Sequence, residues 1–255
     1  KFVEKKTTNQ ENDLLKLPEK LFIREESITS ASGEVIWLQT VKVPININDR
    51  SGLLAVSTDI TERKQYEDEI KFQANHDALT GLPNRRMFNE DLTNLLEKAK
   101  AEASQNAIMF IDLDRFKYIN DTLGHDVGDL LLIEVSRRIE NLLKERHNCA
   151  EVYRLGGDEF TILLPHYNAK NSEAFAKDLL GNFRNSFLVD GSDYFITPSI
   201  GISIFPNDGD DVNTLIKNAD TAMYYVKERG KNNFQLFTSE MHQEFYRKMM
   251  IEKQL

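Results

Sequence analysis

The strongest constraint on the fold is the order in which strand-like and helix-like segments alternate after His76. Short apolar runs alternate with longer amphipathic stretches, which is typical of a sheet covered by helices. Strands are predicted at 107–113, 152–155, 159–164, 194–204 and 233–237, and helices at 84–103, 116–120, 127–144, 172–187 and 212–229. The central order β-α-β-β-α-β predicts an α+β fold: a two-layer, ferredoxin-like palm with a mostly antiparallel sheet and flanking helices.

The first 60 residues follow a different pattern. A short helix closed by Pro18 precedes three alternating runs, at 21–29, 35–44 and 53–59, with turns at 31–33 and 48–52. Two turns between three such runs predict a small antiparallel meander. Three strands and one small helix bury little apolar surface, so this segment is interpreted as part of an incomplete domain.

Two further helices are predicted to flank the main region. Residues 61–75 form a charged helix in which Tyr66, Ile70 and Gln73 make a short stripe. The stripe fits either a coiled coil or a solvated connecting helix. Residues 239–255 carry apolar side chains every fourth position, which suits either a linker into another domain or an unpartnered chain end. The predicted segments are therefore 1–60, 61–75, 76–238 and 239–255.

Composition narrows the possible functions. The 255 residues include 32 basic and 41 acidic side chains, a formal net charge of −9, which argues against a nucleic-acid-binding surface. Cys149 is the single cysteine, so an internal disulfide and a cysteine-rich zinc site are excluded. The sequence contains neither an apolar run long enough to span a bilayer nor a signal peptide. Because the sequence begins at Lys1 and not at Met, we interpret it as a fragment of a longer protein. We expect the fragment to be cytoplasmic. A membrane anchor upstream of it would not be visible in this sequence.

Acidic residues gather at two predicted strand ends. The apolar run 108–111 leads into Asp112, Leu113 and Asp114, and a Gly156-Gly157 turn leads into Asp158 and Glu159. Each motif alone is more often a solvated strand end or an ordinary hairpin. Adjacent strands could bring Asp112 and Asp158 together, and two facing carboxylates repel each other unless a cation lies between them. Mg²⁺, which binds one or two carboxylates together with phosphate oxygens, suits this pattern.

Four motifs in sequence order resemble the GGDEF family of diguanylate cyclases. Residues 156–160 read GGDEF, residues 77–85 read DALTGLPNR, residues 110–129 read FIDLDRFKYINDTLGHDVGD, and residues 227–232 read KERGKN. The resemblance covers about residues 75–238. It implies an enzyme that condenses two GTP molecules into c-di-GMP and releases two pyrophosphates. The reaction would depend on Mg²⁺ or Mn²⁺, two ions per half-site, and on a homodimer.

The resemblance also implies a role for individual residues. The catalytic and metal-binding positions are Asp112, the Leu113 carbonyl, Asp158 and Glu159, where Glu159 either helps to bind metal or acts as a general base. Guanine would be read by Asn120 and Asp129, and phosphates would be held by Phe116, Lys117, Lys227 and Lys231, with Gly156 and Gly157 allowing close approach. Lys231 stands where the family often has Arg, so it keeps the charge without the bidentate fork.

Several of these residues also have ordinary structural interpretations. Asn120 and Asp129 could be helix caps, and Lys227 and Lys231 could be a solvated pair at a helix end. His125 is expected in a turn, as a structural hydrogen-bonding group. Arg154 could pair with an acid or orient a phosphate.

One motif of many family members is missing. An Arg-x-x-Asp product-inhibition site usually ends shortly before the first glycine of GGDEF, but residues 147–150 read HNCA. We therefore expect no product inhibition at this position, and we expect Cys149 to be a small packing residue.

The N-terminal segment has a resemblance of its own. Residues 25–38, 42–44 and 59–63 resemble the C-terminal part of a PAS sensor domain, whose first half is absent. No His precedes His76 and no Cys precedes Cys149, so an axial haem histidine and a flavin-linked cysteine are both missing. Two other functions remain open: a non-catalytic GTP-binding domain that controls a downstream EAL phosphodiesterase domain, and a dimerising scaffold.

Overall fold

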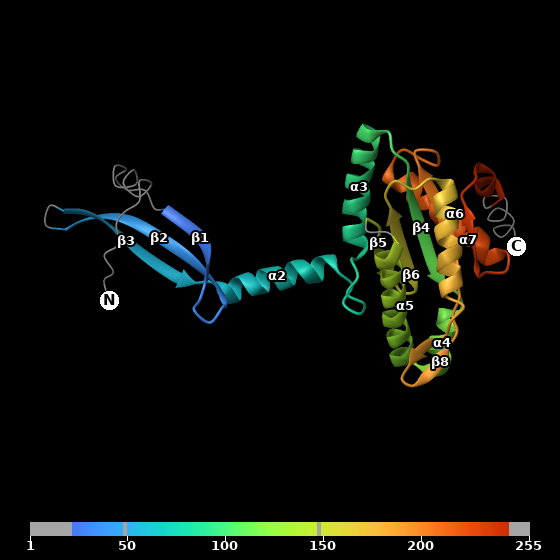
Figure 1. Cartoon of the computed structure of the whole chain (residues 1–255), viewed down its shortest axis with the longest axis horizontal. Helices are drawn as coiled ribbons and strands as arrows, with labels where there is room; N and C mark the ends of the chain where they lie inside the picture. The colour runs from blue at the N-terminus through green and yellow to red at the C-terminus, as the bar shows by residue number, and fades with distance from the viewer. Residues whose placement is uncertain (1–21, 48–49, 147–148, 245–255) are drawn as a thin grey trace, which may run out of the picture. The chain divides into compact units, whose positions relative to one another are not determined.

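The structure is a computed structural model that describes residues 22–47, 50–146 and 149–244 (Figure 1). The chain forms two compact units, Lys1–Phe72 and Gln73–Leu255. No helix in the described part of the chain has the length and apolar character needed to cross a membrane. The short helix predicted before Pro18 lies outside the described residues.

The first unit contains the predicted antiparallel meander. Strands β1 (Phe22–Thr29), β2 (Val35–Ile47) and β3 (Arg50–Asp59) pair in the order β1-β2-β3. Both β2 and β3 reach further into the second turn than predicted. Helix α2 (Thr61–Asn75) follows, as the charged pattern predicted.

The start of α2 is fastened to the first sheet. The Glu25 carboxylate accepts hydrogen bonds from Lys64 Nζ at 2.7 Å and from Arg63 Nη2 at 2.6 Å. These two contacts lower the pKa of Glu25 to about 2. The backbone N–H of Trp37 also donates to the Thr61 hydroxyl at 2.9 Å. The junction between sheet and helix is thus held by several polar contacts.

The second unit is built on a five-stranded sheet with the order β10-β9-β4-β6-β5. Its strands are β4 (Asn106–Leu113), β5 (Glu151–Gly156), β6 (Glu159–Leu164), β9 (Pro198–Phe205) and β10 (Asn233–Leu236). Strands β9, β4, β6 and β5 are antiparallel to their neighbours, and β10 lies parallel to β9. The four antiparallel strands have the predicted ferredoxin-like order, and β10 extends them.

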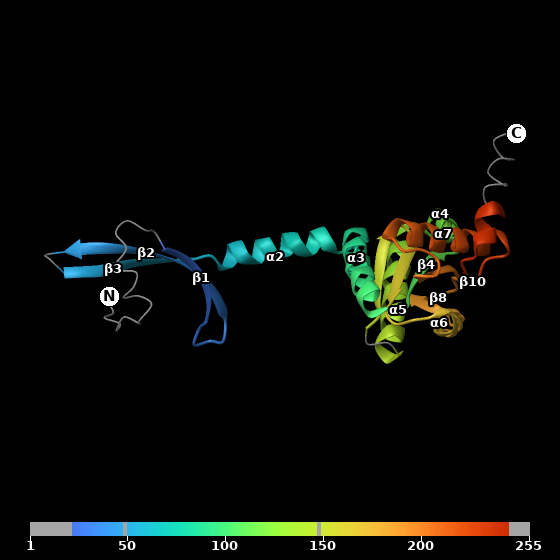
Figure 2. The same ribbon diagram turned by 90° about the horizontal axis from the view of Figure 1, so that it is seen from above.

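Helices cover both faces of this sheet. The bounds are α3 (Arg85–Glu102), α4 (Phe116–Leu123), α5 (His125–Arg146), α6 (Ala169–Asn182) and α7 (Val212–Glu228). Apolar residues of α5 and α6 pack on one face, and those of α3 and α7 pack on the other. Figure 2 shows α7 and α6 on opposite sides of the sheet. The ferredoxin-like palm supplies two layers, and α3 and α7 add a third.

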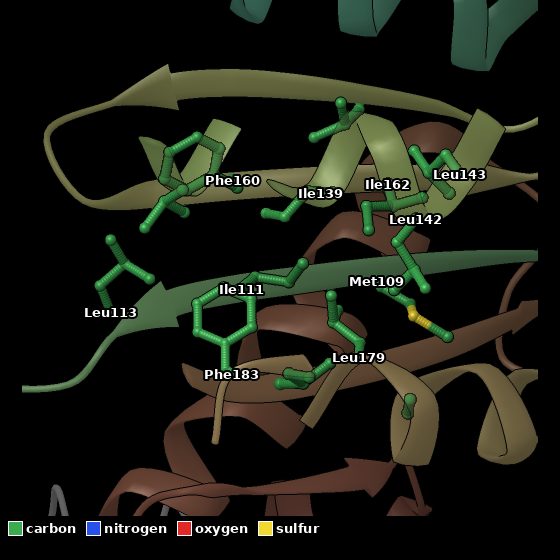
Figure 3. Packing of buried hydrophobic residues seen from close by; sticks show 14 of the residues in the cluster. Met109, Ile111, Leu113, Ile139, Leu142, Leu143, Phe160, Ile162, Leu179 and Phe183 are labelled. Atoms are coloured by element: carbon green, nitrogen blue, oxygen red, sulfur yellow. The ribbon is translucent and has the colours of Figure 1, made fainter. Parts of the chain in front are cut away.

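Strand β4 is the centre of the core, and all eight of its residues are buried. Met109 and Ile111 point toward the α5 and α6 side, where Figure 3 shows them among Ile139, Leu179 and other apolar side chains. Ile108 and Phe110 pack on the opposite side, with α3 and α7. Because side chains alternate along a strand, Asp112 continues the Ile108–Phe110 row toward α7.

The region between α6 and β9 differs from the prediction. The predicted helix 172–187 is wrong at both ends: Asn168 caps α6 by accepting from the Asn171 N–H at 2.9 Å, and the helix ends at Asn182. Arg138 donates to the carbonyls of Asn182, Asn185 and Ser186 just beyond that end. A short hairpin follows, formed by β7 (Phe187–Val189) and β8 (Ser192–Tyr194). The predicted strand 194–204 begins only at Pro198.

The remaining differences are small. Helix α4 continues to Leu123, three residues past the prediction, and Gly124 with φ 90° separates it from α5. His125 was expected in a turn, but it is the first residue of α5. Of the predicted C-terminal helix, residues 239–244 are helical and Met241 is buried, while the rest lies outside the described residues.

Candidate active site

The acidic residues singled out in the sequence meet at one end of two neighbouring strands. Asp112 of β4 lies directly opposite Glu159 of β6 in the strand register. The Leu113 N–H donates to the Asp158 carbonyl at 3.3 Å. Asp112, Leu113, Asp158 and Glu159 therefore lie side by side at the β4 end and the β5–β6 turn.

The turn itself depends on its two glycines. Gly156 has φ 135° and Gly157 has φ 55°, which are backbone conformations that other residues rarely adopt. A Cβ built on either residue would have no atom within 4 Å, so the space outside the turn is open. This geometry leaves room for a large ligand beside Asp158.

The side chain of Arg154 connects the glycine turn to Asp77 through hydrogen bonds. Its Nε and Nη2 donate to the Gly157 carbonyl at 3.1 and 2.8 Å, and its Nη1 lies 2.7 Å from Asp77 Oδ1. Burial would raise the pKa of Asp77, but hydrogen bonds from Thr80 and the Arg154 contact outweigh it and lower the pKa. Of the two interpretations left open by the sequence, the structure has Arg154 paired with an acid.

Asp112 is the most perturbed carboxyl at this site. Burial raises its pKa, Lys227 lowers it, and the nearby charge of Asp158 raises it again, with a net value of about 6. Lys227 reaches it from α7, with Nζ 2.6 Å from Oδ2. The family resemblance assigned Lys227 to phosphate binding. In this structure its ammonium group contacts the Asp112 carboxylate.

The donor set fits a cation that takes few protein ligands. In the described ranges, no three His, Cys, Asp or Glu side chains converge on one point. Glu159 is partly drawn aside, with Oε2 3.5 Å from Arg85 Nη2. Two carboxylates and a main-chain carbonyl match Mg²⁺, which completes its coordination with water and substrate phosphate oxygens. The carboxylates of Asp112 and Asp158 repel each other, and a cation bound between them would relieve that repulsion.

Asp114 has a structural role that sequence reasoning missed. Its buried carboxylate accepts from Thr197 Oγ1 at 2.6 Å, Ser199 Oγ at 2.7 Å and the Asn232 N–H at 2.9 Å. The last contact holds the segment after α7, which includes Lys231, over the end of β4. Its position two residues after Asp112, on the same face of the strand, was the available signal.

Asn120 and Asp129 come from the two helices that follow β4. A Cβ on Gly128 would lie 1.8 Å from Asn120 Oδ1, so α4 and α5 approach each other closely here. Asn120 Oδ1 is buried and has no hydrogen-bond partner in the described structure, whereas Asp129 is exposed. A capping role for Asn120 is therefore not observed. Gly128, which sequence reasoning did not single out, is what makes room for Asn120.

The expected phosphate-binding positions lie around the N-terminus of α4. Phe116 is buried and Lys117 is exposed at the first two helical positions, after Arg115 with φ 61°. Lys231 follows α7 and is exposed, with φ 64°. The start of α4 and the segment after α7 lie close together, since Arg115 and Lys231 line the same cavity as Asp114.

The positions expected to lack product inhibition are only partly described. Residues 147–148 lie outside the described ranges. The expectation that Cys149 is a packing residue is wrong, because the residue is exposed. Cys149 and Ala150 line a cavity of about 540 Å³ together with Glu140, Lys144 and Glu151.

A family model for the GGDEF domain of diguanylate cyclases matches residues 74–233. This chain belongs to the GGDEF family. The family description and the names of its members, which include diguanylate cyclases and a cyclic di-GMP phosphodiesterase, connect the family with c-di-GMP metabolism.

The GGDEF relatives include proteins whose names give different activities. The bifunctional diguanylate cyclase/cyclic di-GMP phosphodiesterase MucR of Pseudomonas aeruginosa is 34% identical over 210 residues, which cover 82% of this chain and 30% of MucR. The cyclic di-GMP phosphodiesterase NbdA of the same species is 37% identical over 186 residues, covering 73% of this chain and 23% of NbdA. The chain thus spans less than a third of either protein.

A solved structure shows the same fold. The GGDEF domain of TpbB from Pseudomonas aeruginosa superposes with a TM-score of 0.64 and 35% identity, covering 67% of this chain and 99% of that domain. The GGDEF fold of the second unit is therefore shown by family, by relatives and by structure.

Proposed function

We propose that this GGDEF domain is a diguanylate cyclase that condenses two GTP molecules into c-di-GMP and two pyrophosphates. The observation that carries the proposal is the meeting of Asp112, Asp158 and Glu159 at one open turn, with Lys227 2.6 Å from Asp112. A domain that only sensed GTP would have less need of all these acids.

The proposed metal ligands are Asp112, Asp158 and the Leu113 carbonyl, with Glu159 as a further ligand or as the general base. A bound Mg²⁺ or Mn²⁺, two ions per half-site, would supply activation of the attacking hydroxyl and neutralise phosphate charge. The protein's own part is to orient these oxygens on a rigid strand end and to hold Lys227 beside them.

Substrate recognition is assigned to α4, α5 and the segment after α7. Asn120 and Asp129 would read the guanine edge, because a carboxylate can accept from N1–H and N2–H₂, a donor pair that adenine lacks. The backbone of Phe116 and Lys117, with the side chains of Lys227 and Lys231, would hold the phosphates.

In the first reaction step, the 3′-oxygen of one GTP forms a bond to the α-phosphorus of the other. The bond from that phosphorus to the bridging oxygen breaks, pyrophosphate leaves, and the 3′-OH proton passes to a base, for which Glu159 is the proposed group. In the second step the two nucleotides exchange roles: the remaining 3′-oxygen forms a bond to the remaining α-phosphorus, the second pyrophosphate leaves, and the ring closes. Each domain binds one GTP, so two copies must face each other.

The second candidate function is a non-catalytic GTP-binding domain that controls a downstream EAL phosphodiesterase domain. It is favoured by relatives such as NbdA, which is named a phosphodiesterase and is several times longer than the matched region. A helix also begins at residue 239, directly after the GGDEF domain. In either function, residues 1–60 are proposed to be a partial PAS sensor that regulates the domain through the helix at 61–75.

Incubation of the chain with GTP and Mg²⁺ tests the proposal. We expect the chain to form two pyrophosphates for each c-di-GMP. The Asp158→Ala variant should form neither product. A dimeric protein that binds GTP without turnover would support the regulatory alternative instead. Asp129→Ala should reduce discrimination between GTP and ATP, and unchanged discrimination would exclude the guanine assignment.

A further inference from the structure

The chain packs on α7 after it leaves the sheet. The Phe237 N–H donates to the Ile202 carbonyl of β9 at 2.7 Å, and a helical turn follows at residues 239–244. Residues 238–244 form a strap, which includes the red helical turn beside α7 in Figure 2. Met241 of this turn is only 5% exposed, so the strap is packed against the domain.

Polar contacts fasten the strap to α7 at two points. His242 Nε2 lies 2.7 Å from Asn218 Oδ1, and Asn218 donates from Nδ2 to the Asp208 carbonyl at 2.5 Å. Because the amide nitrogen of Asn218 is used in this way, its oxygen is the acceptor and His242 is the donor. Just past the end of α7, Arg229 Nη2 donates to Glu244 Oε1 at 3.0 Å.

Met241 lies between these two fastenings. It lines a cavity of about 220 Å³ together with Thr221 and Tyr225 of α7. Asn218, Thr221, Tyr225 and Arg229 follow one another at intervals of three and four residues, so they form one stripe along the helix. The strap therefore covers a continuous stripe of α7.

Lys227 lies on the opposite side of α7 from this stripe. It follows Tyr225 by two residues, which is roughly 200° around the helix axis. Its Nζ is 2.6 Å from Asp112 Oδ2. The close packing of α7 on Gly201 of β9 limits how near the helix can come to the sheet, but it does not stop the helix from moving outward. The strap is on the side from which outward movement can be blocked.

We propose that Met241 and His242 are positioning residues that hold α7 against the sheet, so that Lys227 stays at Asp112. The inference rests on the proposed function, because it concerns a lysine that is proposed to hold phosphate. It also extends the site beyond residue 233, where the match to the family model ends. Both residues act through α7 and touch neither nucleotide nor cation.

Hydrogen exchange in the whole chain without nucleotide tests whether the strap holds α7. Met241→Ala removes most of the buried strap side chain, so amides of α7 should exchange about tenfold faster or more. Amides of α5, on the other face of the sheet, should change by less than about twofold. Met241→Leu keeps the side-chain volume and should exchange like the unaltered chain. Gln243→Ala, at an exposed strap position, is the matched control and should change nothing.

His242→Ala is a milder second variant, for use if Met241→Ala does not fold. It removes one hydrogen bond to α7 and leaves Met241 in place. Exchange of the α7 amides should rise by about threefold or more, again without a change in α5.

Equilibrium binding of 3′-deoxy-GTP and GMP with Mg²⁺ tests whether the site depends on the strap. The first ligand lacks the attacking hydroxyl and so cannot turn over, and the second lacks the β- and γ-phosphates. Displacement of Lys227 should affect the phosphates most, so Met241→Ala should weaken 3′-deoxy-GTP by about tenfold and GMP by less than about twofold. Met241→Leu and Gln243→Ala should bind both ligands like the unaltered chain.

The outcomes separate this inference from the proposed function. If Met241→Ala and His242→Ala leave α7 exchange unchanged, or speed α5 equally, the strap does not position α7 and the inference is wrong. It is also wrong if α7 exchange rises while the two ligands weaken equally or not at all. If the unaltered chain binds neither nucleotide, the proposed function fails and this inference fails with it. If exchange and binding follow the expected pattern but GTP gives no c-di-GMP, the strap is supported and the cyclase activity is not.

Discussion

Asp112 is a buried carboxyl near two other charged groups, the ammonium group of Lys227 and the carboxylate of Asp158. Burial and Asp158 together outweigh the lysine, so its pKa is raised to about 6. A carboxyl with a raised pKa binds a proton more readily, and the proton competes with any cation for the same oxygens.

Cation binding to this site should therefore weaken as the pH falls through about 6. The carboxylate is ionised above that pH and is progressively protonated below it, where apparent affinity should drop by up to about tenfold per pH unit. Titration of Mn²⁺ by electron paramagnetic resonance between pH 5 and 8 measures this. Asp112→Asn should bind weakly at every pH, and an affinity for the unaltered chain that stays flat from pH 5 to 7 would contradict the prediction.

Gly128 determines where the side chain of Asn120 can lie in the proposed guanine site, because it has no side chain of its own. Gly128→Ala places a methyl group 1.8 Å from Asn120 Oδ1 and 3.3 Å from Phe116 Cζ, so the Asn120 side chain must move. If Asn120 reads guanine as proposed, loss of its hydrogen bond to the base should lower GTP affinity by roughly tenfold, measured by calorimetry. Gly181→Ala is the matched control, because nothing lies within 4 Å of its Cβ in α6. It should leave GTP binding unchanged, and equal GTP affinity in both variants would contradict the prediction.

At the residue scale, the sequence could predict that Asp112 and Asp158 lie at one end of the sheet. It could not predict the individual side-chain contacts of Lys227 and Arg154. Asp112 and Asp158 meet because Asp112 lies near the end of β4 and Asp158 in the turn between β5 and β6 of the same sheet, and the strand pattern of the sequence makes both positions visible. The contact of Lys227 with Asp112 depends on where α7 lies against the sheet. The position of Arg154 on Asp77 depends on a loop closure across 77 positions in the chain. Such long-range placements leave no periodic signal in the sequence.

Among the elements, α7 is the one whose position the site needs most, because it carries Lys227. It lies so close to β9 that a Cβ on Gly201 would be 2.0 Å from the Ala219 carbonyl oxygen and 2.2 Å from the Met223 nitrogen. Both are backbone atoms, so the clash cannot be relieved by a side-chain rotation. The whole helix would have to shift.

Gly201→Ala should therefore lower the free energy of unfolding by about 3 kcal/mol or more, the upper range for overpacking a core. Urea unfolding followed by circular dichroism measures this, with Gly181→Ala as the control. A glycine-to-alanine change in an open helical position should raise stability by about 0.4–1 kcal/mol. A Gly201→Ala variant as stable as the unaltered chain would show that α7 is free to move.

The elements also show where sequence patterns fail. The apolar periodicity of 172–187 continues past the true end of α6, because Phe183 and Phe187 are both buried. Neither belongs to the helix: Phe183 follows its last residue, and Phe187 begins strand β7 of the hairpin. The Asp190-Gly191 pair, with φ 49° and 75°, was a recognisable hairpin signal between them. By contrast, β4, β6 and α7 were predicted nearly to the residue, since each is strongly periodic and bounded by a turn or a cap.

At the scale of the whole molecule, the net charge of −9 argues against a nucleic-acid-binding surface, and the same acidity could be taken to argue against binding any phosphate. Within the proposed site the inference reverses, because the carboxylates would hold cations that in turn attract phosphates. The proposed reaction also needs two copies of the chain, since each GGDEF domain would bind one GTP. Whatever sets the distance between two copies therefore sets the activity.

Helix α2 is the proposed contact between copies. Tyr66 and Ile70 are 56% and 65% exposed and lie four residues apart, on one face of a helix that buries none of its residues. Replacement of both by Lys places like charges where two copies would meet. The double variant should sediment as a monomer at concentrations where the unaltered chain is a dimer. Its turnover per domain should fall by about tenfold or more at low concentration and recover as concentration rises, because mass action governs association.

The control adds the same charge away from that stripe, with Gln65→Lys and Asp68→Asn, both at exposed positions of α2. It should keep the dimer and its turnover. Binding of 3′-deoxy-GTP should be equal in all three proteins, because α2 contributes nothing to the proposed nucleotide site. If the Tyr66 and Ile70 variant lost turnover while remaining a dimer, α2 would act on the geometry of the pair and not on its formation. If both variants behaved like the unaltered chain, the contact between copies would have to lie elsewhere than on α2.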